Sequence, residues 1–187
     1  MSDIKASDIE IAIAHYFNPR QNLIVPNISW GMGLHECDIL IASALGYLTE
    51  IEIKISAADL KKDAMKRHGH VDRMGRIKKL YFAMPKKLTH LCEYVPERAG
   101  ILSYYVDDDG NEQLKEIRPA RATKKARPLN EGEMHEMARL GAMRIWGLKR
   151  KIKDLQERKK CQTLTDGTES EGLPLIHNLR TRRAERA

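Results

Sequence analysis

Two acidic residues and a lysine stand where a pair of strands would bring them together. Asp38 opens the apolar run Ile39–Ile41, and Glu52 and Lys54 lie in the next segment, where apolar and polar residues alternate. Side chains two positions apart share one face of a strand, so Glu52 and Lys54 point the same way. An antiparallel hairpin that turns near Gly46 would place Asp38 beside them. The sequence therefore predicts two carboxylates and one ammonium group at a single spot.

This combination of groups has a definite chemistry. Two carboxylates held together repel each other, and a bound cation relieves that repulsion. Hard oxygen ligands favour Mg²⁺ or Mn²⁺. A neighbouring lysine can orient or help deprotonate an attacking water, or neutralise charge on a pentacoordinate phosphate. These parts suffice for metal-assisted hydrolysis of a phosphodiester bond. The alternative is an exposed strand whose Glu–Lys pair contributes little energy.

The same residues carry a resemblance to a known superfamily. Asp38 followed by Glu52-Ile53-Lys54 resembles the PD-(D/E)xK nuclease signature, although Cys37 stands where the motif's name has Pro. The run from Glu52 to Asp63 resembles the E-x-K-x-S-x-x-D-[LF]-x-x-D pattern of the MmcB-type DNA-repair endonuclease branch and related phage proteins. Two later blocks are similar to the YFAVP and P-x-x-AGLI segments of that branch: Leu80–Pro85 and Pro96–Leu102. The resemblance covers roughly residues 1–106.

The resemblance implies an α/β fold of the restriction-endonuclease-like type, with a mixed β-sheet flanked by helices. The apolar spacing after residue 130 adds a C-terminal helical extension to this fold. It implies a Mg²⁺- or Mn²⁺-dependent DNA endonuclease that acts in DNA repair or recombination. Asp38 and Glu52 would hold the metal, and the Ile53 carbonyl would be a further ligand. Lys54 would serve the attacking water. Glu50 shares the face of Glu52 and is a substitute for it, but the motif spacing favours Glu52.

Glu10 has two competing roles. Residues 7–17 read as the first helix, and many PD-(D/E)xK nucleases have a glutamate on that helix that faces the metal. Glu10 holds this place here and is the next catalytic candidate. Ser7 and Glu10 also have the spacing of a capping box, in which Glu10 would bond back to the helix start.

Composition sets the broad class. The chain has 187 residues, 42% of them hydrophobic, and a net charge of +7, which suits one core with an appendage and a polyanionic partner such as DNA. Three cysteines without CxxC spacing favour a reducing compartment and argue against a zinc site or a disulfide framework. No apolar run approaches the length of a membrane span and no signal-peptide pattern opens the chain, so we expect a cytoplasmic protein without a membrane partner.

Basic residues near the predicted site are candidates for nucleic-acid contacts. A helix predicted from Ser56 to about residue 67 carries several of them on its polar face, and a basic linker at 121–129 carries the others. Lysine and arginine make most phosphate contacts, so such surfaces can track DNA. The alternative in both places is a solvated basic face. The candidates are Lys61, Lys62, Lys66, Arg67, Arg121, Lys124 and Lys125.

The chain divides into four predicted segments. Residues 1–120 form the nuclease-like core, 121–129 the basic linker, 130–160 a long helix and 161–187 a flexible basic tail. Asn130 is expected to cap the helix, with Glu133 three residues on. The helix either packs on its own core or pairs with a second copy, giving a homodimer through residues 134–155. Its apolar seam comprises Met134, Met137, Gly141, Ile145, Leu148, Ile152 and Leu155.

Three other functions remain open at this level. A Holliday-junction resolvase-like, structure-selective nuclease has a similar acidic pattern, and a two-fold helical seam would suit a junction. A non-catalytic DNA-binding protein on the same fold is a second alternative, although such a protein could freely lose the two acids and the lysine. A scaffold whose C-terminal helix matters most is the third. The pattern does not distinguish DNA from RNA, nor one DNA sequence or structure from another.

Overall fold

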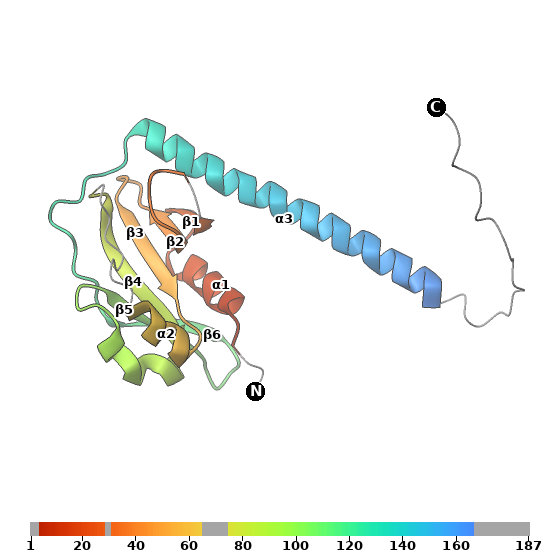
Figure 1. The fold of residues 1–187 in the computed structure, drawn as a ribbon, viewed down its shortest axis with the longest axis horizontal. Helices are drawn as coiled ribbons and strands as arrows, with labels where there is room; N and C mark the ends of the chain where they lie inside the picture. Colours follow the sequence, from red (N-terminus) through yellow and green to blue (C-terminus); the bar gives the residue numbers. More distant parts are fainter. Residues whose placement is uncertain (1–3, 29–30, 65–74, 167–187) are drawn as a thin grey trace, which may run out of the picture. The chain divides into compact units, whose positions relative to one another are not determined.

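The computed structural model describes residues 4–28, 31–64 and 75–166. Its centre is a six-stranded mixed sheet whose strands follow one another in chain order (Figure 1). The pairs β3–β4 and β4–β5 are parallel, and the other neighbouring pairs are antiparallel. The strands are β1 (Leu23–Ile28), β2 (Cys37–Ala42), β3 (Leu48–Ile53), β4 (Ile77–Pro85), β5 (Gly100–Val106) and β6 (Glu112–Arg118). The helical elements are α1 (Ala6–Tyr16), α2 (Ala57–Ala64), the 3₁₀ helix η1 (Lys86–Tyr94) and α3 (Glu131–Asp166).

This architecture confirms the predicted fold class, an α/β protein with a mixed sheet, flanking helices and a C-terminal helix. Pro26 lies in β1, an edge strand, where its missing N–H costs no ladder hydrogen bond. Contacts divide the chain into two units, residues 1–145 and 146–187. Among the described residues, no helix is long and apolar enough to cross a membrane.

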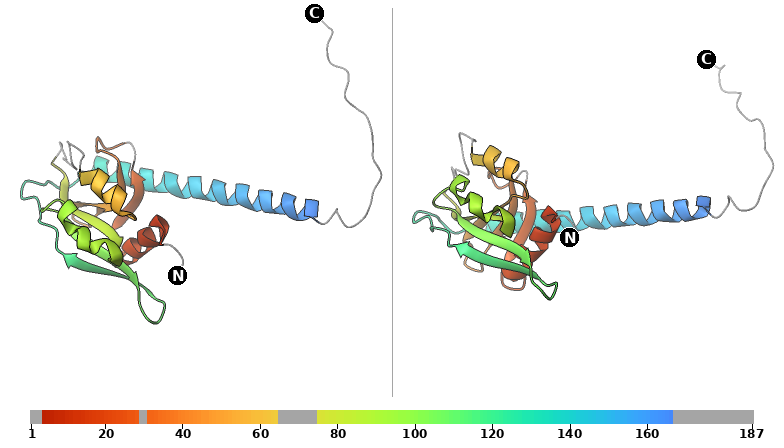
Figure 2. Two further views of the ribbon diagram at one scale, coloured as in Figure 1. Left: turned by 60° about the horizontal axis from the view of Figure 1, so that its bottom comes forward. Right: turned by 90° about the horizontal axis from the view of Figure 1, so that it is seen from below.

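The two faces of the sheet are covered differently. α1 packs Ile9 and Ile13 against one face, where they meet side chains of β2 to β5 such as Ile39 and Ile51. On the other face α2 and η1 cover β4 and β5, while the first turns of α3 cover β1 and β2. Figure 2 shows α1 and α2 on opposite sides of the sheet. Two separate apolar clusters therefore share the second face, with β3 between them.

The β2–β3 hairpin has a fixed register. Its recorded pairs run from Ile39–Ile51 to Ala42–Leu48. The turn uses Gly46 in the left-handed region, with φ +78°, and this glycine lies against the backbone of Leu129. The Leu129 N–H donates to the Gly46 carbonyl at 2.9 Å. The turn is thus fastened to the segment that leads into α3.

The β5–β6 hairpin ends in an exposed turn of the acidic residues Asp107–Asp109. The Asp107 carboxylate accepts backbone N–H groups from Asp109 at 3.1 Å and Asn111 at 2.8 Å. These bonds are those of a polar hairpin turn, in which an aspartate side chain closes the loop.

Two predictions about helix ends are wrong. α1 begins at Ala6, and Asp8 accepts the Lys5 N–H at 2.8 Å, so the capping acid is Asp8 and not Glu10. The reason is that Lys5 is the N-cap, which makes Asp8 the third helical residue. At the other end of the chain, α3 continues to Asp166, past the predicted start of the tail at residue 161. Residues 167–187 lie outside the described residues.

The basic linker is attached to the core instead of hanging as a free tether. Its backbone N–H groups at Arg121, Thr123 and Arg127 donate to carbonyls of Arg98, Lys78 and Gly75 at distances of 2.8–3.1 Å. The linker then leads into the predicted cap of α3. Asn130 and Glu133 exchange side-chain-to-backbone hydrogen bonds at 2.9 and 3.0 Å, so this capping box is confirmed.

Glu133 also anchors the start of α3 by an ion-pair network. Its carboxylate binds the buried Arg76 at 3.1 Å and the Arg127 guanidinium through two bonds of 2.7 Å. Arg76 donates in turn to the Met32 carbonyl. The hydrogen bonds from Arg127, helped by Asn130 and Arg76, outweigh burial and lower the pKa of Glu133 to about 2.

We expect Glu133→Gln to destabilise the protein at pH 7 by about 2 kcal/mol, because charged hydrogen bonds to two arginines are lost. The depressed pKa stabilises the wild type fully above the ordinary value of 4.5, and this contribution disappears as the pH falls toward 2. Thermal unfolding of both proteins across this range should show their difference shrinking. Glu157→Gln, which removes an exposed 3.8 Å pair with Lys153, is the matched control and should change stability by less than about 0.5 kcal/mol. A difference between the wild type and Glu133→Gln that stays constant with pH would contradict the assignment.

Candidate active site

The predicted residues meet where β2 and β3 separate. The last recorded pair of their ladder is Ile39–Ile51. Beyond it the Asp38 carboxylate accepts the Ile53 N–H at 2.7 Å, in place of a backbone carbonyl. On the other side of β3, the Lys54 N–H donates to the Ala83 carbonyl of β4 at 2.9 Å. The end of β3 is therefore held between a side chain of β2 and the backbone of β4.

A buried charge cluster occupies the face of β3 that carries Glu52. The Lys54 ammonium lies 3.0 Å from a carboxylate oxygen of Glu52 and 3.5 Å from one of Asp63 in α2. None of the three residues is more than 6% exposed. The alternative of an exposed strand with an ordinary surface pair is wrong, because the two apolar clusters on this face enclose β3.

Sequence reasoning did not assign Asp63 to the site. The signal was present, since Asp63 follows the fully buried Leu60 by three residues and so shares its helix face. Lys61 and Lys62, by contrast, are exposed on the same helix. α2 thus turns one acid inward and two cations outward.

A cavity of about 250 Å³ opens at this point. Asp38, Glu52, Ile53 and Lys54, all predicted site residues, line it together. Two flanking acids and one thiol complete the wall. The full lining is Glu36, Cys37, Asp38, Glu52, Ile53, Lys54 and Asp59.

The electrostatics of the cavity are negative around a single cation. Burial and four neighbouring carboxylates, with Glu50 and Glu52 foremost, raise the pKa of the Cys37 thiol far above its ordinary value. Burial alone would lower the pKa of Lys54, but Glu52, through its charge and its hydrogen bond, and the more distant Asp63 and Asp59 raise it. Lys54 therefore stays charged, and the surrounding acids favour a further cation.

Glu10 and Glu50 differ in their relation to this cavity. Burial, and then the charge of Asp38, raise the pKa of Glu10, while a hydrogen bond with Asn27 lowers it. Glu10 is therefore close enough to Asp38 for their charges to interact, as its predicted role beside the metal would require. Glu50 is fully buried, binds the His35 Nε2 at 2.7 Å and is not among the residues that line the cavity, although its charge acts on Cys37 in the cavity wall.

The donor set suits a hard cation. Within the described ranges, no three His, Cys, Asp or Glu side chains are grouped to hold a metal ion. Mg²⁺ does not need such a cage, since it commonly uses one or two carboxylates and keeps several waters. Asp38 and Glu52 in one polar cavity, with Ile53 beside them, fit that requirement.

The predicted nucleic-acid contacts in the linker lie on the surface. Lys124 and Lys125 are exposed in the linker, while Arg121 pairs with Glu97 at 3.0 Å. The remaining two, Lys66 and Arg67, lie outside the described residues.

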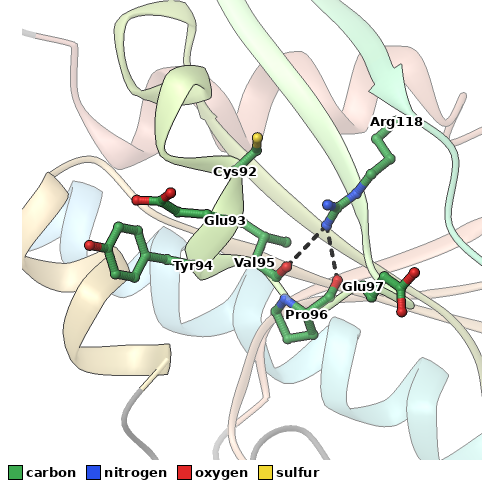
Figure 3. A pocket seen from close by; sticks show the side chains of 7 residues that line it. All are labelled: Cys92, Glu93, Tyr94, Val95, Pro96, Glu97 and Arg118. Carbon is green, nitrogen blue, oxygen red and sulfur yellow. Dashed lines mark hydrogen bonds between the residues drawn. The ribbon is translucent and has the colours of Figure 1, made fainter.

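A larger cavity of about 480 Å³ lies elsewhere, between the end of η1 and β6 (Figure 3). Its charged centre is Arg118, which donates to the carbonyls of Val95 at 3.3 Å and Pro96 at 2.9 Å. A third bond of 2.9 Å reaches the Ala99 carbonyl. Because these bonds use the guanidinium to fasten β6 to the loop before β5, the cavity is better explained as part of the fold than as a binding site.

The fold and cavity define an α/β protein with an acidic, lysine-containing site at the end of a β-hairpin. No protein-family model and no curated protein matches the sequence. The structure is similar to that of a protein of unknown function from Silicibacter pomeroyi, with a TM-score of 0.56 and 19% identity over 79% of this chain and 94% of that one. At this identity the likeness shows the fold alone.

We expect Lys54→Met to destabilise the protein by about 3 kcal/mol, because it leaves two buried carboxylates without their cation. Urea denaturation would measure the loss. The double variant Lys54→Met/Glu52→Gln should recover part of it, since one of the two carboxylates is then neutral. Lys153→Met, at an exposed pair, is the control and should stay within about 0.5 kcal/mol of wild type. A stability of Lys54→Met equal to that of the control would show that the cluster does not hold the fold.

Proposed function

We propose that this protein is a Mg²⁺- or Mn²⁺-dependent DNA endonuclease that hydrolyses phosphodiester bonds in DNA repair or recombination. One observation carries the proposal: Asp38, Glu52 and Lys54 line one polar cavity at the end of a split hairpin. The resemblance of this segment to the PD-(D/E)xK signature, within a restriction-endonuclease-like arrangement, supports the same assignment.

Each residue has a role that its geometry permits. Asp38 is oriented by its bond to the Ile53 N–H, and Glu52 lies on the neighbouring strand, so that both carboxylates border one space. A bound Mg²⁺ or Mn²⁺ would supply positive charge beside the phosphate and make an attacking water more acidic. Lys54, kept protonated by its acidic neighbours, would donate hydrogen bonds to the phosphate as negative charge develops there. Glu10, whose pKa the charge of Asp38 raises, would be an additional carboxylate near the site.

The first test is cleavage of plasmid, linear and four-way-junction DNA with Mg²⁺, Mn²⁺ or EDTA. Asp38→Asn is the sharpest variant, because an amide oxygen can still accept the Ile53 N–H while the charge is lost. We expect Asp38→Asn and Glu52→Gln to reduce metal-dependent cleavage by about 100-fold or more, as loss of a group that stabilises developing charge does. Asp108→Asn, in the exposed β5–β6 turn, is the matched control and should cleave like wild type.

The outcomes separate the alternative functions. Preference for the four-way junction would identify a resolvase-like enzyme. If the wild type cuts no substrate with either metal, yet binds DNA equally well as Asp38→Asn, the catalytic proposal fails and a DNA-binding protein remains. Folding of each variant, checked by circular dichroism, keeps a lost activity interpretable.

DNA binding should depend on the exposed cations of α2 and the linker. Each phosphate contact contributes about 0.9 to the slope of log binding constant against log salt concentration. We expect Lys124→Gln/Lys125→Gln to reduce that slope by about 2. Arg121→Gln should have a smaller effect, since Glu97 already pairs with this arginine.

Fluorescence anisotropy over a range of salt concentrations would measure these slopes. Lys87→Gln/Lys115→Gln removes two other exposed lysines and serves as the control. An equal loss in both double variants would mean that only net charge matters and that the linker makes no defined contact.

A further inference from the structure

The middle of α3 carries an apolar stripe that no described residue covers. Its members, Ile145, Leu148, Ile152 and Leu155, are each between 53% and 57% exposed. Earlier in the same helix Met137 and Leu140 are buried against the sheet. Leu140 was not part of the predicted seam, whereas Met137 was.

The spacing of the stripe is that of a coiled-coil seam. Steps of three, four and three residues place Ile145 and Ile152 at the first position of a heptad, with Leu148 and Leu155 at the fourth. With 3.6 residues per turn, these four side chains cover an arc of about 80°, and the exposed Trp146 lies outside that arc. A helix that lies in a membrane surface, or packs in a globular core, usually presents a wider apolar face. The narrow stripe favours one partner helix.

The residues that flank the stripe are basic or neutral. Lys149 and Gln156 border it on one side, and Lys151 and Arg158 on the other. The two acids of this segment, Asp154 and Glu157, fall at outer heptad positions, where Glu157 lies 3.8 Å from Lys153. Flanking positions set partner choice in coiled coils, because they face each other across the seam.

A second copy of this chain is a poor partner for such a seam. In a parallel or an antiparallel pair, Lys149, Lys151 and Arg158 of both copies would gather along one contact, with no flanking acid to neutralise them. Like charges that face each other across an interface repel and so weaken binding of the wrong partner. This charge pattern disfavours the predicted homodimer through residues 134–155.

We propose that residues 145–158 of α3 are a docking helix for an acidic amphipathic helix of another protein. The partner helix has apolar residues in the same heptad spacing and Glu or Asp at the flanking positions. Apolar side chains of both helices fill the seam, and the flanking acids of the partner pair with Lys149, Lys151 and Arg158. This inference does not depend on the proposed nuclease activity, because it concerns the protein partner that α3 binds.

The test uses the full chain and two labelled synthetic peptides that share Ile and Leu at the seam positions. One peptide carries Glu and the other Lys at every flanking position. By fluorescence anisotropy at physiological salt, we expect the acidic peptide to bind at least about ten-fold more tightly, the ratio that roughly 1.4 kcal/mol of charge complementarity produces. Leu148→Ser/Ile152→Ser should abolish binding of the acidic peptide.

Charge-reversal variants distinguish contacts at the flanking positions from a general attraction between opposite net charges. Lys149→Glu/Lys151→Glu should transfer the preference to the basic peptide, whereas Arg150→Glu/Lys153→Glu, with the same change of net charge at outer positions, should leave the preference for the acidic peptide. These side chains are exposed, so all variants should unfold near the wild-type temperature. Equal effects of the two double variants would overturn the proposal.

Two further measurements test whether a second copy of the chain or a lipid surface binds the stripe instead. Sedimentation equilibrium of the wild-type chain alone should give a monomer, and a dimer lost in Leu148→Ser/Ile152→Ser would overturn the proposal in favour of a second copy. Vesicles of equal parts phosphatidylserine and phosphatidylcholine should not displace the acidic peptide. Displacement that the same Ser variant abolishes would assign the stripe to an anionic lipid surface instead.

Discussion

The Lys54 ammonium between the carboxylates of Glu52 and Asp63 is the interaction on which the site depends. A charged group removed from water costs several kcal/mol unless it is paired, so none of these three side chains could be buried alone. The pairing requires α2 to dock where Asp63 can reach Lys54. It also requires the second face of the sheet to have a polar strip, because an apolar cluster there would leave the charges unsatisfied. The division of that face into two clusters follows from the same requirement.

The split between β2 and β3 has a related cause. A continuous ladder would satisfy the Ile53 N–H with a backbone carbonyl and leave Asp38 as one more side chain on the strand. Instead the carboxylate takes that hydrogen bond, which fixes the direction of Asp38 in the wall of the cavity. This hydrogen bond thus stands where the backbone pairing of β2 and β3 ends, and it orients a candidate metal ligand. The cavity lies where these two strands are no longer joined by backbone hydrogen bonds.

Much of this arrangement could be predicted from residue order. The alternation around Glu52 indicated its strand, the glycine indicated the turn, and the spacing then placed Asp38, Glu52 and Lys54 together. The blocks Leu80–Pro85 and Pro96–Leu102 coincide with β4 and the entry to β5 in the structure. The rest depended on contacts between residues distant in sequence. No local pattern pairs Arg76 with Glu133, and the inward direction of Asp63 follows from how α2 docks. The cap of α1 was misassigned because several polar residues at its start had capping chemistry, and only the backbone decides between them.

The two hairpin turns differ in how well they would accommodate added sequence. The Gly46 turn is held by Leu129, and its length sets which residue of β3 opposes Asp38; one extra residue in the paired strands would carry Glu52 to the opposite face. The Asp107–Asn111 turn closes on its own side chain at an exposed tip, remote in sequence from the charge cluster. A peptide tag inserted there would lengthen a loop without shifting any strand of the site. This turn therefore offers an attachment point for a reporter that leaves the strands around the cavity unchanged.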